Sequence, residues 1–475
     1  MSSVRTVLLS TTTAAIGLAG TLVLGVPSAA AAPTCQGREA TVVGPNSGRS
    51  TVGTPGDDVI VTTAEGFEGP GSITSGDGND LVCIAVGTGP LPGAEVDAGF
   101  VVATGNGDDT VVVEEPRRTS YLAVVLGAGD DTFVGSDRNE TVYAGERPSS
   151  ERLGADDGRD TITAGGGEDH VYTGSPLPDT PNNDVVSTGD GQDTVVHGGT
   201  GTTLDNGAGD GDNLSLVRHR WGQARVTVDN RARLASGDAG VFLRWSNVHF
   251  LNVEVDSPAT VIGSDADEIV YASSTLPLEQ RASVPVDVHL NGGHDSFTFS
   301  DGPLAGRVDG GAGIDSLEVP ICADVRYVLD SSFTCTRNGD SGPVTLTAGV
   351  AGIEGRAVVR ARQDAVVVGS ADDDAVVVNA RRIRMFGHGG DDTLTVSPLV
   401  RARASVLVVG GAGSDELRGA RSADTLRGSS GRDVLLGSSG GDRLLGGAGR
   451  DLARGGQGRD TCSAERHSGC EVVRR

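Results

Sequence analysis

The sequence contains no lysine, so its 38 basic residues are all arginine. Without lysine there can be neither a Walker A motif nor Schiff-base chemistry. Aromatic residues make up only 3% of the 475 residues, which leaves little surface on which sugar rings could stack. The 64 acidic residues bring the net charge to −26, and so acidic a surface repels nucleic acid phosphates. Lysine-dependent enzymes are therefore excluded, and nucleic-acid binding is disfavoured.

After its first 31 residues the sequence also lacks an apolar run of the ~20 residues that a membrane-spanning helix needs. Those first residues are different, because Arg5 precedes an apolar stretch over residues 7–26 that leads into a run of alanines. This order is typical of a secretory signal peptide, here residues 1–31 with cleavage near Ala31. A retained anchor is the alternative, but Ser10 and its neighbours interrupt the apolar run. We therefore predict an extracellular protein with no membrane span after cleavage.

The six cysteines all follow the predicted cleavage point. An even number of cysteines in an exported chain favours disulfides, and six of them allow about 15 pairings. A metal site is the alternative, but no C-x-x-C spacing or neighbouring histidine supports it. We expect the local pairings Cys322–Cys335, Cys462–Cys470 and Cys35–Cys83.

Glycine is abundant, with 73 residues, and near the C-terminus it is periodic. Residues 410–463 divide into six contiguous nonapeptides: GGAGSDELR, GARSADTLR, GSSGRDVLL, GSSGGDRLL, GGAGRDLAR and GGQGRDTCS. The sixth position is always aspartate: Asp415, Asp424, Asp433, Asp442, Asp451 and Asp460. The eighth position is apolar or small: Leu417, Leu426, Leu435, Leu444, Ala453 and Cys462. The pattern resembles the glycine-aspartate nonapeptide of the RTX, or hemolysin-type calcium-binding, repeat family.

The glycines and aspartates of this pattern also have direct physical consequences. Glycine at positions one, two and four allows left-handed backbone conformations that turn carbonyl groups inward. The residues after the aspartate form a short strand whose middle side chain, at position eight, points to the interior. Each nonapeptide is then half a turn, and loops two nonapeptides apart stack. Stacking sets the carboxylates roughly 4.8 Å apart, where they repel each other unless a cation lies between them, and oxygen ligands favour Ca²⁺.

The resemblance implies an all-β, right-handed parallel β-helix or β-roll solenoid that holds Ca²⁺ between loops two repeats apart. By position, one edge would pair Asp415 with Asp433 and Asp433 with Asp451. The other edge would pair Asp424 with Asp442 and Asp442 with Asp460. Loop carbonyls would complete the coordination, from Gly410, Gly428, Gly437, Gly446 and Gly455. The second repeat departs from the pattern, because Ala420 and Ser422 replace glycines.

A metal-free solenoid in which aspartate only caps turns is the alternative. Residues 410–463 contain eight arginines against six aspartates and Glu416, a net charge of +1. Those arginines could neutralise part of the aspartate column. Salt bridges alone would not require the glycines, so we favour calcium.

Similar glycine-aspartate corners recur upstream at longer intervals. Asp58, Asp80, Asp109, Asp131 and Asp160 follow one another at alternating shorter and longer steps, each of them longer than two nonapeptides. Such steps predict a larger β-helix, with one corner per coil and further faces formed by intervening strands, that narrows to a tight β-roll at the end. We expect Asp160, Asp169 and Asp392 to be metal ligands in this upstream part.

The organisation that we predict has five parts after the signal peptide. They are an irregular β-solenoid over residues 32–213, irregular coils or an insertion over 214–260, a continued solenoid over 261–409, the nonapeptide β-roll over 410–463 and a disulfide-closed C-terminal cap over 464–475. Residues 322–355 form a second interruption of the pattern.

Enzyme motifs are weak in this sequence. There is no H-E-x-x-H, and a G-x-S-x-G match at residues 437–441 lies within the repeat. We therefore expect no enzyme, but a calcium-binding solenoid with a structural or adhesive role toward a cell-surface or matrix polymer, which folds on meeting extracellular calcium. The alternative is a calcium-dependent polysaccharide lyase or epimerase, in which Arg384 beside the GHGGDD corner would remove a proton.

Overall fold

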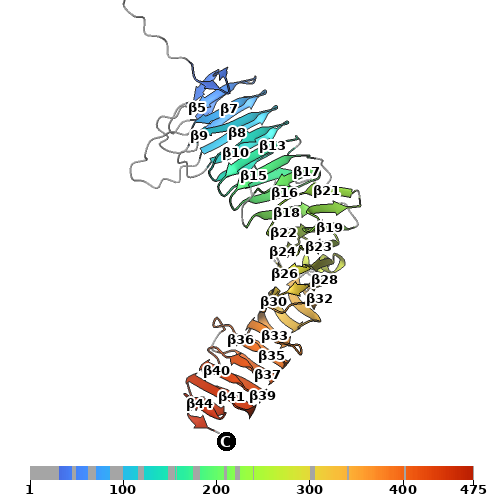
Figure 1. Ribbon diagram of the computed structural model, residues 1–475, viewed down its shortest axis with the longest axis vertical. Helices are drawn as coiled ribbons and strands as arrows, with labels where there is room; N and C mark the ends of the chain where they lie inside the picture. The colour runs from blue at the N-terminus through green and yellow to red at the C-terminus, as the bar shows by residue number, and fades with distance from the viewer. Residues whose placement is uncertain are drawn as a thin grey trace, which may run out of the picture.

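The computed structural model describes residues 32–473, apart from residues 45–49, 63–70, 86–99, 116–121, 148–155, 157, 175–181, 208–210, 220–224, 239, 300–304, 340–341 and 401–402. The predicted signal peptide, residues 1–31, lies outside the described residues. Figure 1 shows a long, curved stack of strands that runs from the N-terminal coils to the C-terminal coils. In the described part of the chain, no helix is long and apolar enough to cross a membrane.

The fold is all-β, as predicted, and 41 of the described strands form one hydrogen-bonded network. The N-terminal coils contain β1 (Thr34–Cys35), β2 (Arg38–Glu39), β3 (Val42–Gly44), β4 (Ser50–Val52), β5 (Val59–Thr62), β6 (Gly71–Asp77), β7 (Leu81–Ala85), β8 (Phe100–Asn106), β9 (Thr110–Glu115), β10 (Leu122–Ala128), β11 (Thr132–Val134), β12 (Glu140–Tyr143), β13 (Thr161–Gly166), β14 (His170–Gly174), β15 (Val185–Asp190), β16 (Thr194–Gly198), β17 (Thr202–Asp205) and β18 (Asn213–His219).

These N-terminal strands form two parallel stacks, one on each side of the coil. One stack joins β5, β7, β9, β11, β13, β15 and β17, and the other joins β6, β8, β10, β12, β14, β16 and β18. The expectation of a larger β-helix with further faces is therefore wrong for the described residues, where each coil supplies two strands. Much of the additional length between corners falls at residues 63–70 and 86–99, which are outside the described part.

The middle of the chain interrupts the parallel stacking twice. It contains β19 (Val226–Asp229), β20 (Leu234–Gly237), β21 (Gly240–Arg244), β22 (Phe250–Val255), β23 (Ala259–Ile262), β24 (Ile269–Ser273), the 3₁₀ turn η1 (Leu278–Ser283), β25 (Val286–His289), β26 (Gly292–Gly293), β27 (Ser296–Phe299), β28 (Gly306–Asp309), β29 (Ala312–Gly313), β30 (Ser316–Val328), β31 (Ser332–Gly339), β32 (Gly342–Ala351) and β33 (Arg356–Val368). Antiparallel pairs link β19, β20 and β21, and a second set links β30, β31 and β32. Both segments remain joined to the stack, because β19 pairs in parallel with β23 and β30 with β33.

The C-terminal coils are regular and tight. They contain β34 (Ala375–Asn379), β35 (Arg382–Gly389), β36 (Thr393–Val396), β37 (Ser405–Ala412), β38 (Glu416–Arg418), β39 (Asp424–Gly431), β40 (Val434–Ser439), β41 (Arg443–Gly449), β42 (Leu452–Gln457), β43 (Thr461–Ser463), β44 (Arg466–Ser468) and β45 (Val472–Val473). In β39, Leu426 lies opposite Val408 of β37 and Leu444 of β41, each of which is separated from it by two nonapeptide lengths. The predicted stacking of loops two nonapeptides apart is thus confirmed.

The core of these coils is a column of the position-eight side chains. Leu417, Leu426, Leu435, Leu444, Ala453 and Cys462 are all fully buried. Leucine at this position removes an apolar side chain from water once per half turn, and a long chain can therefore be stabilised without many aromatic residues. The prediction that position eight points inward is confirmed.

All three predicted disulfides are present: Cys35–Cys83, Cys322–Cys335 and Cys462–Cys470. The last one joins β43 to the final turn of the chain. That turn still belongs to the stack, because β44 pairs in parallel with β42 and β45 with β43.

Candidate metal sites

Aspartates at the corners form hydrogen-bonded ladders along the edges of the solenoid. In each ladder, the backbone N–H of one corner residue donates to the carboxylate of the corner residue in the next coil. The N–H of Asp415 donates to Asp433 and the N–H of Asp433 to Asp451, both at 3.0 Å. On the other edge, Asp424 donates to Asp442 and Asp442 to Asp460, both at 2.8 Å. The structure therefore brings together the aspartate neighbours that the repeat spacing predicted.

Five such ladders occur among the described residues. Ladder A contains Asp58, Asp80, Asp109, Asp131, Asp160 and Asp184. Ladder B contains Glu140, Asp169, Asp193 and Asp212. Ladder C contains Glu268, Asp295 and Asp315. Ladder D contains Asp374, Asp392, Asp415, Asp433, Asp451 and Glu465, and ladder E contains Asp424, Asp442, Asp460 and Glu471. The upstream residues Asp160, Asp169 and Asp392 are thus ladder members.

The second oxygen of most ladder carboxylates is buried and has no hydrogen-bond partner in the described structure. These atoms include Oδ2 of Asp160, Asp169, Asp392, Asp415, Asp433, Asp442, Asp451 and Asp460. A buried carboxylate oxygen without a donor is costly, because its water of hydration has been removed and nothing replaces it. The ladders therefore leave rows of unsatisfied oxygens at the corners.

The glycine at position one of each nonapeptide makes room for this oxygen. A Cβ atom at Gly428 would overlap Oδ2 of Asp433, and one at Gly446 would overlap Oδ2 of Asp451. Neither glycine has a positive φ. The expectation that position one needs a left-handed backbone is therefore wrong, since its requirement is space for the carboxylate.

Positions two and four do adopt the left-handed region. Gly447 has a φ of 115° and Gly449 a φ of 148°. Position two keeps this conformation even where serine replaces glycine, with a φ of 91° at Ser429 and 76° at Ser438. The backbone conformation of the corner is therefore retained across the third to sixth repeats.

Carbonyl oxygens of the next coil lie on the same side as the unsatisfied carboxylate oxygens. A Cβ atom added to Gly428 would lie 2.6 Å from the Gly446 carbonyl oxygen. The same added atom would also overlap Asp433 Oδ2. The same arrangement occurs at Gly437, because a Cβ atom added there would lie 2.6 Å from the Gly455 carbonyl oxygen. A cation near both oxygen atoms would be a partner for the carboxylate oxygen, and carboxylate plus carbonyl oxygen is the ligand set that suits Ca²⁺. The residues present thus fit calcium.

The second nonapeptide is an exception, and its corner is closed by its own backbone. The N–H of Ala420 donates to Asp424 Oδ2 at 2.7 Å, and the Ser422 hydroxyl donates to the other oxygen of the same carboxylate. Both oxygens therefore have donors without a metal ion. Asp424 is a structural cap in this form, which is the role that the metal-free alternative assigned to every aspartate.

Three upstream corners share this self-capped geometry. At Asp58, Glu268 and Asp374, the donor is the backbone N–H of the residue at position two of the same corner, at 2.6 to 3.0 Å. Those residues are Thr54, Ser264 and Ser370, none of which has a positive φ. Sequence reasoning missed this distinction, and a residue other than glycine at position two does not by itself reveal it, because Ser429 and Ser438 keep the left-handed backbone.

The C-terminal ends of ladders D and E are closed by glutamates outside the nonapeptides. Glu465 accepts the N–H of Asp451 at 2.9 Å, and Glu471 accepts the N–H of Asp460 at 2.7 Å. The hydrogen bond from Asp451 holds the pKa of Glu465 below its usual range. These residues were not predicted, because their spacing departs from the two-repeat period.

A second, exposed row of hydrogen bonds runs beside ladder A with the opposite polarity. Here the N–H of the later coil donates to the side chain of the earlier one, as from Asn79 to Asp57 at 2.9 Å and from Asp108 to Asn79 at 3.0 Å. The row continues from Asp130 to Asp108 at 3.0 Å. The residue before each buried aspartate therefore reinforces the corner from outside.

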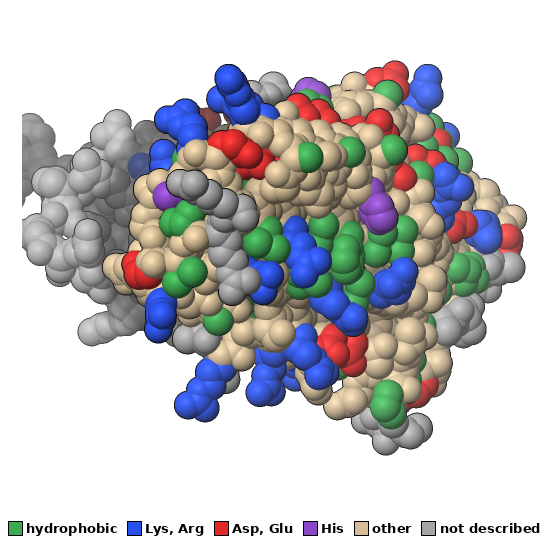
Figure 2. All heavy atoms as spheres, turned by 90° about the horizontal axis from the view of Figure 1, so that it is seen from below, with side chains coloured by type: hydrophobic (Ala, Val, Ile, Leu, Met, Phe, Trp, Pro, Cys, Tyr) green, Lys and Arg blue, Asp and Glu red, His purple; other side chains and the backbone are tan. Residues whose placement is uncertain are grey.

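Arginines do not neutralise the nonapeptide aspartates. All eight arginines of residues 410–463 are exposed, whereas the six aspartates are buried. Figure 2 shows arginine side chains spread over the surface seen from the C-terminal end. Within residues 410–463, the one ion pair that the described structure contains joins Arg418 to Glu416. The alternative in which arginines balance the column is therefore not supported.

Burial raises the pKa of many ladder carboxyls. Burial, followed by the charges of its ladder neighbours, raises the pKa of Asp442 to about 7 and that of Asp433 to about 6. The same causes raise the pKa of Asp392 to about 7, Asp169 to about 8 and Asp160 to about 9. Part of the ladder is thus protonated at neutral pH unless a cation lies beside it.

Comparison with known families agrees with this geometry. The RTX calcium-binding nonapeptide repeat matches the chain in four copies, at residues 125–146, 150–175, 407–435 and 436–466. The last two copies cover the nonapeptides, and the first two cover parts of ladders A and B. A search of curated proteins finds no match.

Proposed function

We propose that this chain, which carries RTX calcium-binding nonapeptide repeats, is a secreted solenoid that binds calcium along its corners and serves a structural or adhesive role. The observation that carries the proposal is the row of buried Oδ2 atoms that have no hydrogen-bond donor in the described structure and lie on the same side of the corner as loop carbonyl oxygens. Calcium bound there would neutralise charge and supply the missing partner to both oxygens. The ions would link consecutive coils rather than take part in a reaction.

Export is the finer part of the proposal and rests on three supports. RTX repeat proteins are usually secreted, and residues 1–31 have the order of charged, apolar and small residues that signal peptides share. Three disulfides also suit an oxidising compartment. Extracellular calcium modules typically bind at about 10⁻⁴ to 10⁻³ M, which suits calcium-dependent folding after export.

Calcium titration of the full mature chain at pH 7 tests the binding function. We expect saturable binding that releases protons, because carboxyls such as Asp442 and Asp169 have raised pKa values and must ionise when the ion binds. Isothermal calorimetry in two buffers of different ionisation enthalpy measures this release. Absence of binding up to 10-fold above the ~10⁻³ M of weak extracellular sites would contradict the function itself.

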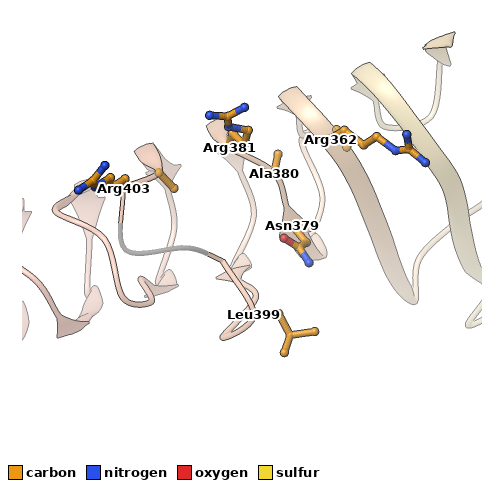
Figure 3. Close-up of a pocket in the computed structure, with 8 residues that line it drawn as sticks. Arg362, Asn379, Ala380, Arg381, Leu399 and Arg403 are labelled. Carbon is orange, nitrogen blue, oxygen red and sulfur yellow. The ribbon is translucent and has the colours of Figure 1, made fainter. Parts of the chain in front are cut away.

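An arginine-lined hollow supports the adhesive part of the proposal. Arg362, Arg381 and Arg403 line one side of a cavity of about 670 Å³ together with Asn379 and Leu399 (Figure 3). They come from three consecutive coils, because the N–H of Arg381 donates to the Gln363 carbonyl and the Ser405 N–H donates to the Arg381 carbonyl.

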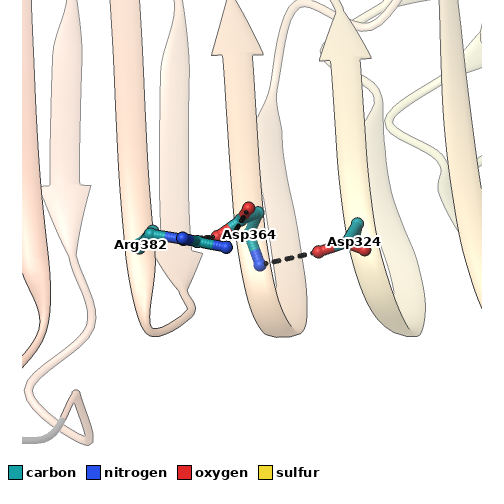
Figure 4. Close-up of polar contacts among 3 residues, drawn as sticks. All are labelled: Asp324, Asp364 and Arg382. Atoms are coloured by element: carbon teal, nitrogen blue, oxygen red, sulfur yellow. Dashed lines mark hydrogen bonds and ion pairs between the residues drawn. The ribbon is translucent and has the colours of Figure 1, made fainter.

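These three guanidinium groups make no ion pair with the described residues, in contrast to their neighbour Arg382. Arg382 is paired with Asp364, whose N–H donates to Asp324 at 3.1 Å (Figure 4). Arginines without an ion-pair partner on consecutive coils of an acidic protein can contact successive charges of a linear anion. We therefore assign this hollow to an anionic polysaccharide.

Replacing Arg362, Arg381 and Arg403 together by glutamine should weaken binding to immobilised polygalacturonate at least 10-fold in the presence of calcium, because three charge-assisted contacts are lost. Surface plasmon resonance measures the change. The matched control replaces Arg231, Arg244 and Arg326, which are exposed elsewhere, and should bind like the unmodified chain. Equal binding by both variants would refute the assignment. Release of unsaturated product absorbing in the ultraviolet would instead favour the lyase alternative.

A further inference from the structure

We propose that Asp156, Asp160 and Asp184 form a three-carboxylate calcium site that differs from the nonapeptide sites and binds more tightly than they do. The inference deepens the proposed function and rests on it for the identity of the ion. The three carboxylates offer ligand oxygens that all lie within 4.8 Å of one another. Among the described residues, the other group with such close ligand atoms contains the disulfide-bonded Cys35 and Cys83, which cannot bind a metal ion as thiolates.

The unusual member of the site is Asp156. It stands at position two of the corner that ends in Asp160, where the nonapeptides have Gly411, Ser429 or Ser438. Of the corners that contribute to the five ladders, this is the one with an acidic residue at position two. The corner therefore adds a third carboxylate to the pair that consecutive ladder residues already provide.

The three carboxylates are held in place by neighbours from three segments. Asp160 Oδ1 accepts the N–H of Asp131 at 2.9 Å, and Asp184 Oδ1 accepts the N–H of Asp160 at 2.9 Å. Asp156 Oδ2 accepts the Asn182 side-chain amide at 2.7 Å, and Asp184 Oδ2 accepts the Thr173 hydroxyl. The oxygens are thus oriented before any ion binds, which lowers the cost of ordering them.

One oxygen of the site has no hydrogen-bond donor. Asp160 is fully buried, and its Oδ2 lacks such a partner in the described structure. Asp184 is also fully buried, and Asp156 is 4% exposed. The Asp160 Oδ2 atom is therefore a buried carboxylate oxygen that a cation between the three carboxylates would bind.

The charges at the site support the same conclusion. No ion pair of the described residues involves Asp160 or Asp184. The three carboxylates have ligand oxygens within 4.8 Å of one another, so they repel each other when they are ionised. A divalent ion would relieve this repulsion.

The donor set favours calcium over a transition metal. All three ligands are carboxylates, and the described polar neighbours Thr173 and Asn182 also carry oxygen. Hard oxygen ligands select calcium or magnesium, and a higher number of charged ligands increases calcium affinity. Three carboxylates should therefore hold calcium at concentrations that leave the two-carboxylate ladder sites empty.

The test uses Asp156→Gly, which restores the glycine of the repeat pattern, and Asp156→Asn, which keeps the size of the side chain. Calcium is titrated into the calcium-stripped full chain, and terbium luminescence measures the tight phase independently. We expect the unmodified chain to show a site at least 10-fold tighter than the rest. Both variants should lose this phase and keep the weaker sites. Asp137→Asn, at an exposed acid in position three of the Glu140 corner, serves as the matched control and should behave like the unmodified chain.

The outcomes separate this inference from the proposed function. If the chain binds calcium but the tight phase persists in both variants, or no tight phase exists, the three-carboxylate site is wrong and calcium binding stands. If the unmodified chain binds no calcium, the proposed function fails. Circular dichroism of each variant with saturating calcium shows whether it is folded, and Asp156→Asn is the decisive variant should the glycine variant unfold.

Discussion

Chelation of calcium from the purified chain is expected to lower its thermal midpoint by about 10 °C or more and to reduce its β-sheet content. The physical reason is that buried oxygens such as Asp433 Oδ2 and Asp442 Oδ2 have no donor in the described structure, so a bound ion would be their partner. One site at 10 times its dissociation constant contributes about 1.4 kcal/mol, and several sites act together along a stacked solenoid. Circular dichroism melting with and without a chelator measures the effect.

The pH dependence of the chelated protein provides an internal check. The pKa of Asp442 is about 7 and that of Asp169 about 8 in the folded chain, well above the ordinary value near 3.8. The folded state therefore binds more protons than the unfolded state, and without calcium its stability should fall as the pH rises from about 4 to about 8. Saturating calcium should remove most of this decline. Identical melting curves with and without chelator at every pH would contradict the calcium dependence.

Substitution of Gly428 by alanine is expected to destabilise the C-terminal coils by about 1–3 kcal/mol. The added methyl group would occupy the space of Asp433 Oδ2 and approach the Gly446 carbonyl oxygen. Either the carboxylate leaves its buried position or the two coils separate. Hydrogen exchange of residues 424–451, which form β39 to β41 and the corners around them, measures the local loss.

Gly441→Ala is the matched control in the same array. Gly441 has no positive φ, and the nearest atom to an added Cβ would be the Arg459 carbonyl oxygen at 3.4 Å. We expect its effect to stay within about 0.5 kcal/mol, as for an ordinary surface substitution. If both alanines were equally harmless, the position-one glycine would not be making room for a carboxylate.

The regular part of the fold could be predicted because one period sets several features at once. A strict nonapeptide repeat fixes which residues stack, so the burial of Leu426 and the neighbourhood of Asp415 and Asp433 followed directly from the spacing. The disulfide Cys462–Cys470 was predictable for a similar reason, since short separations leave few other partners.

The rest of the candidate sites could not be predicted, because they depend on contacts between coils of unequal length. Asp156 approaches Asp184 across a gap in sequence that no period relates. The role of Gly428 is steric, and a sequence pattern does not distinguish a need for space from a need for a left-handed backbone. Glu465 accepts the N–H of Asp451 in the position where ladder D otherwise has an aspartate. Its side chain is longer than that of aspartate, and this compensates for a coil that is shorter than two nonapeptides.

The glutamates that close ladders D and E make the last contacts of the array different from its interior contacts. An interior aspartate such as Asp433 accepts a hydrogen bond from the coil before it and donates one to the coil after it, so the interior units share one pattern of contacts. After the last nonapeptide aspartates, Asp451 and Asp460, the backbone N–H groups donate to Glu465 and Glu471 instead of to another aspartate. Duplication or deletion of whole units within the array would therefore leave the two glutamate contacts unchanged. Such solenoids can change in length during evolution while they keep the same closing contacts.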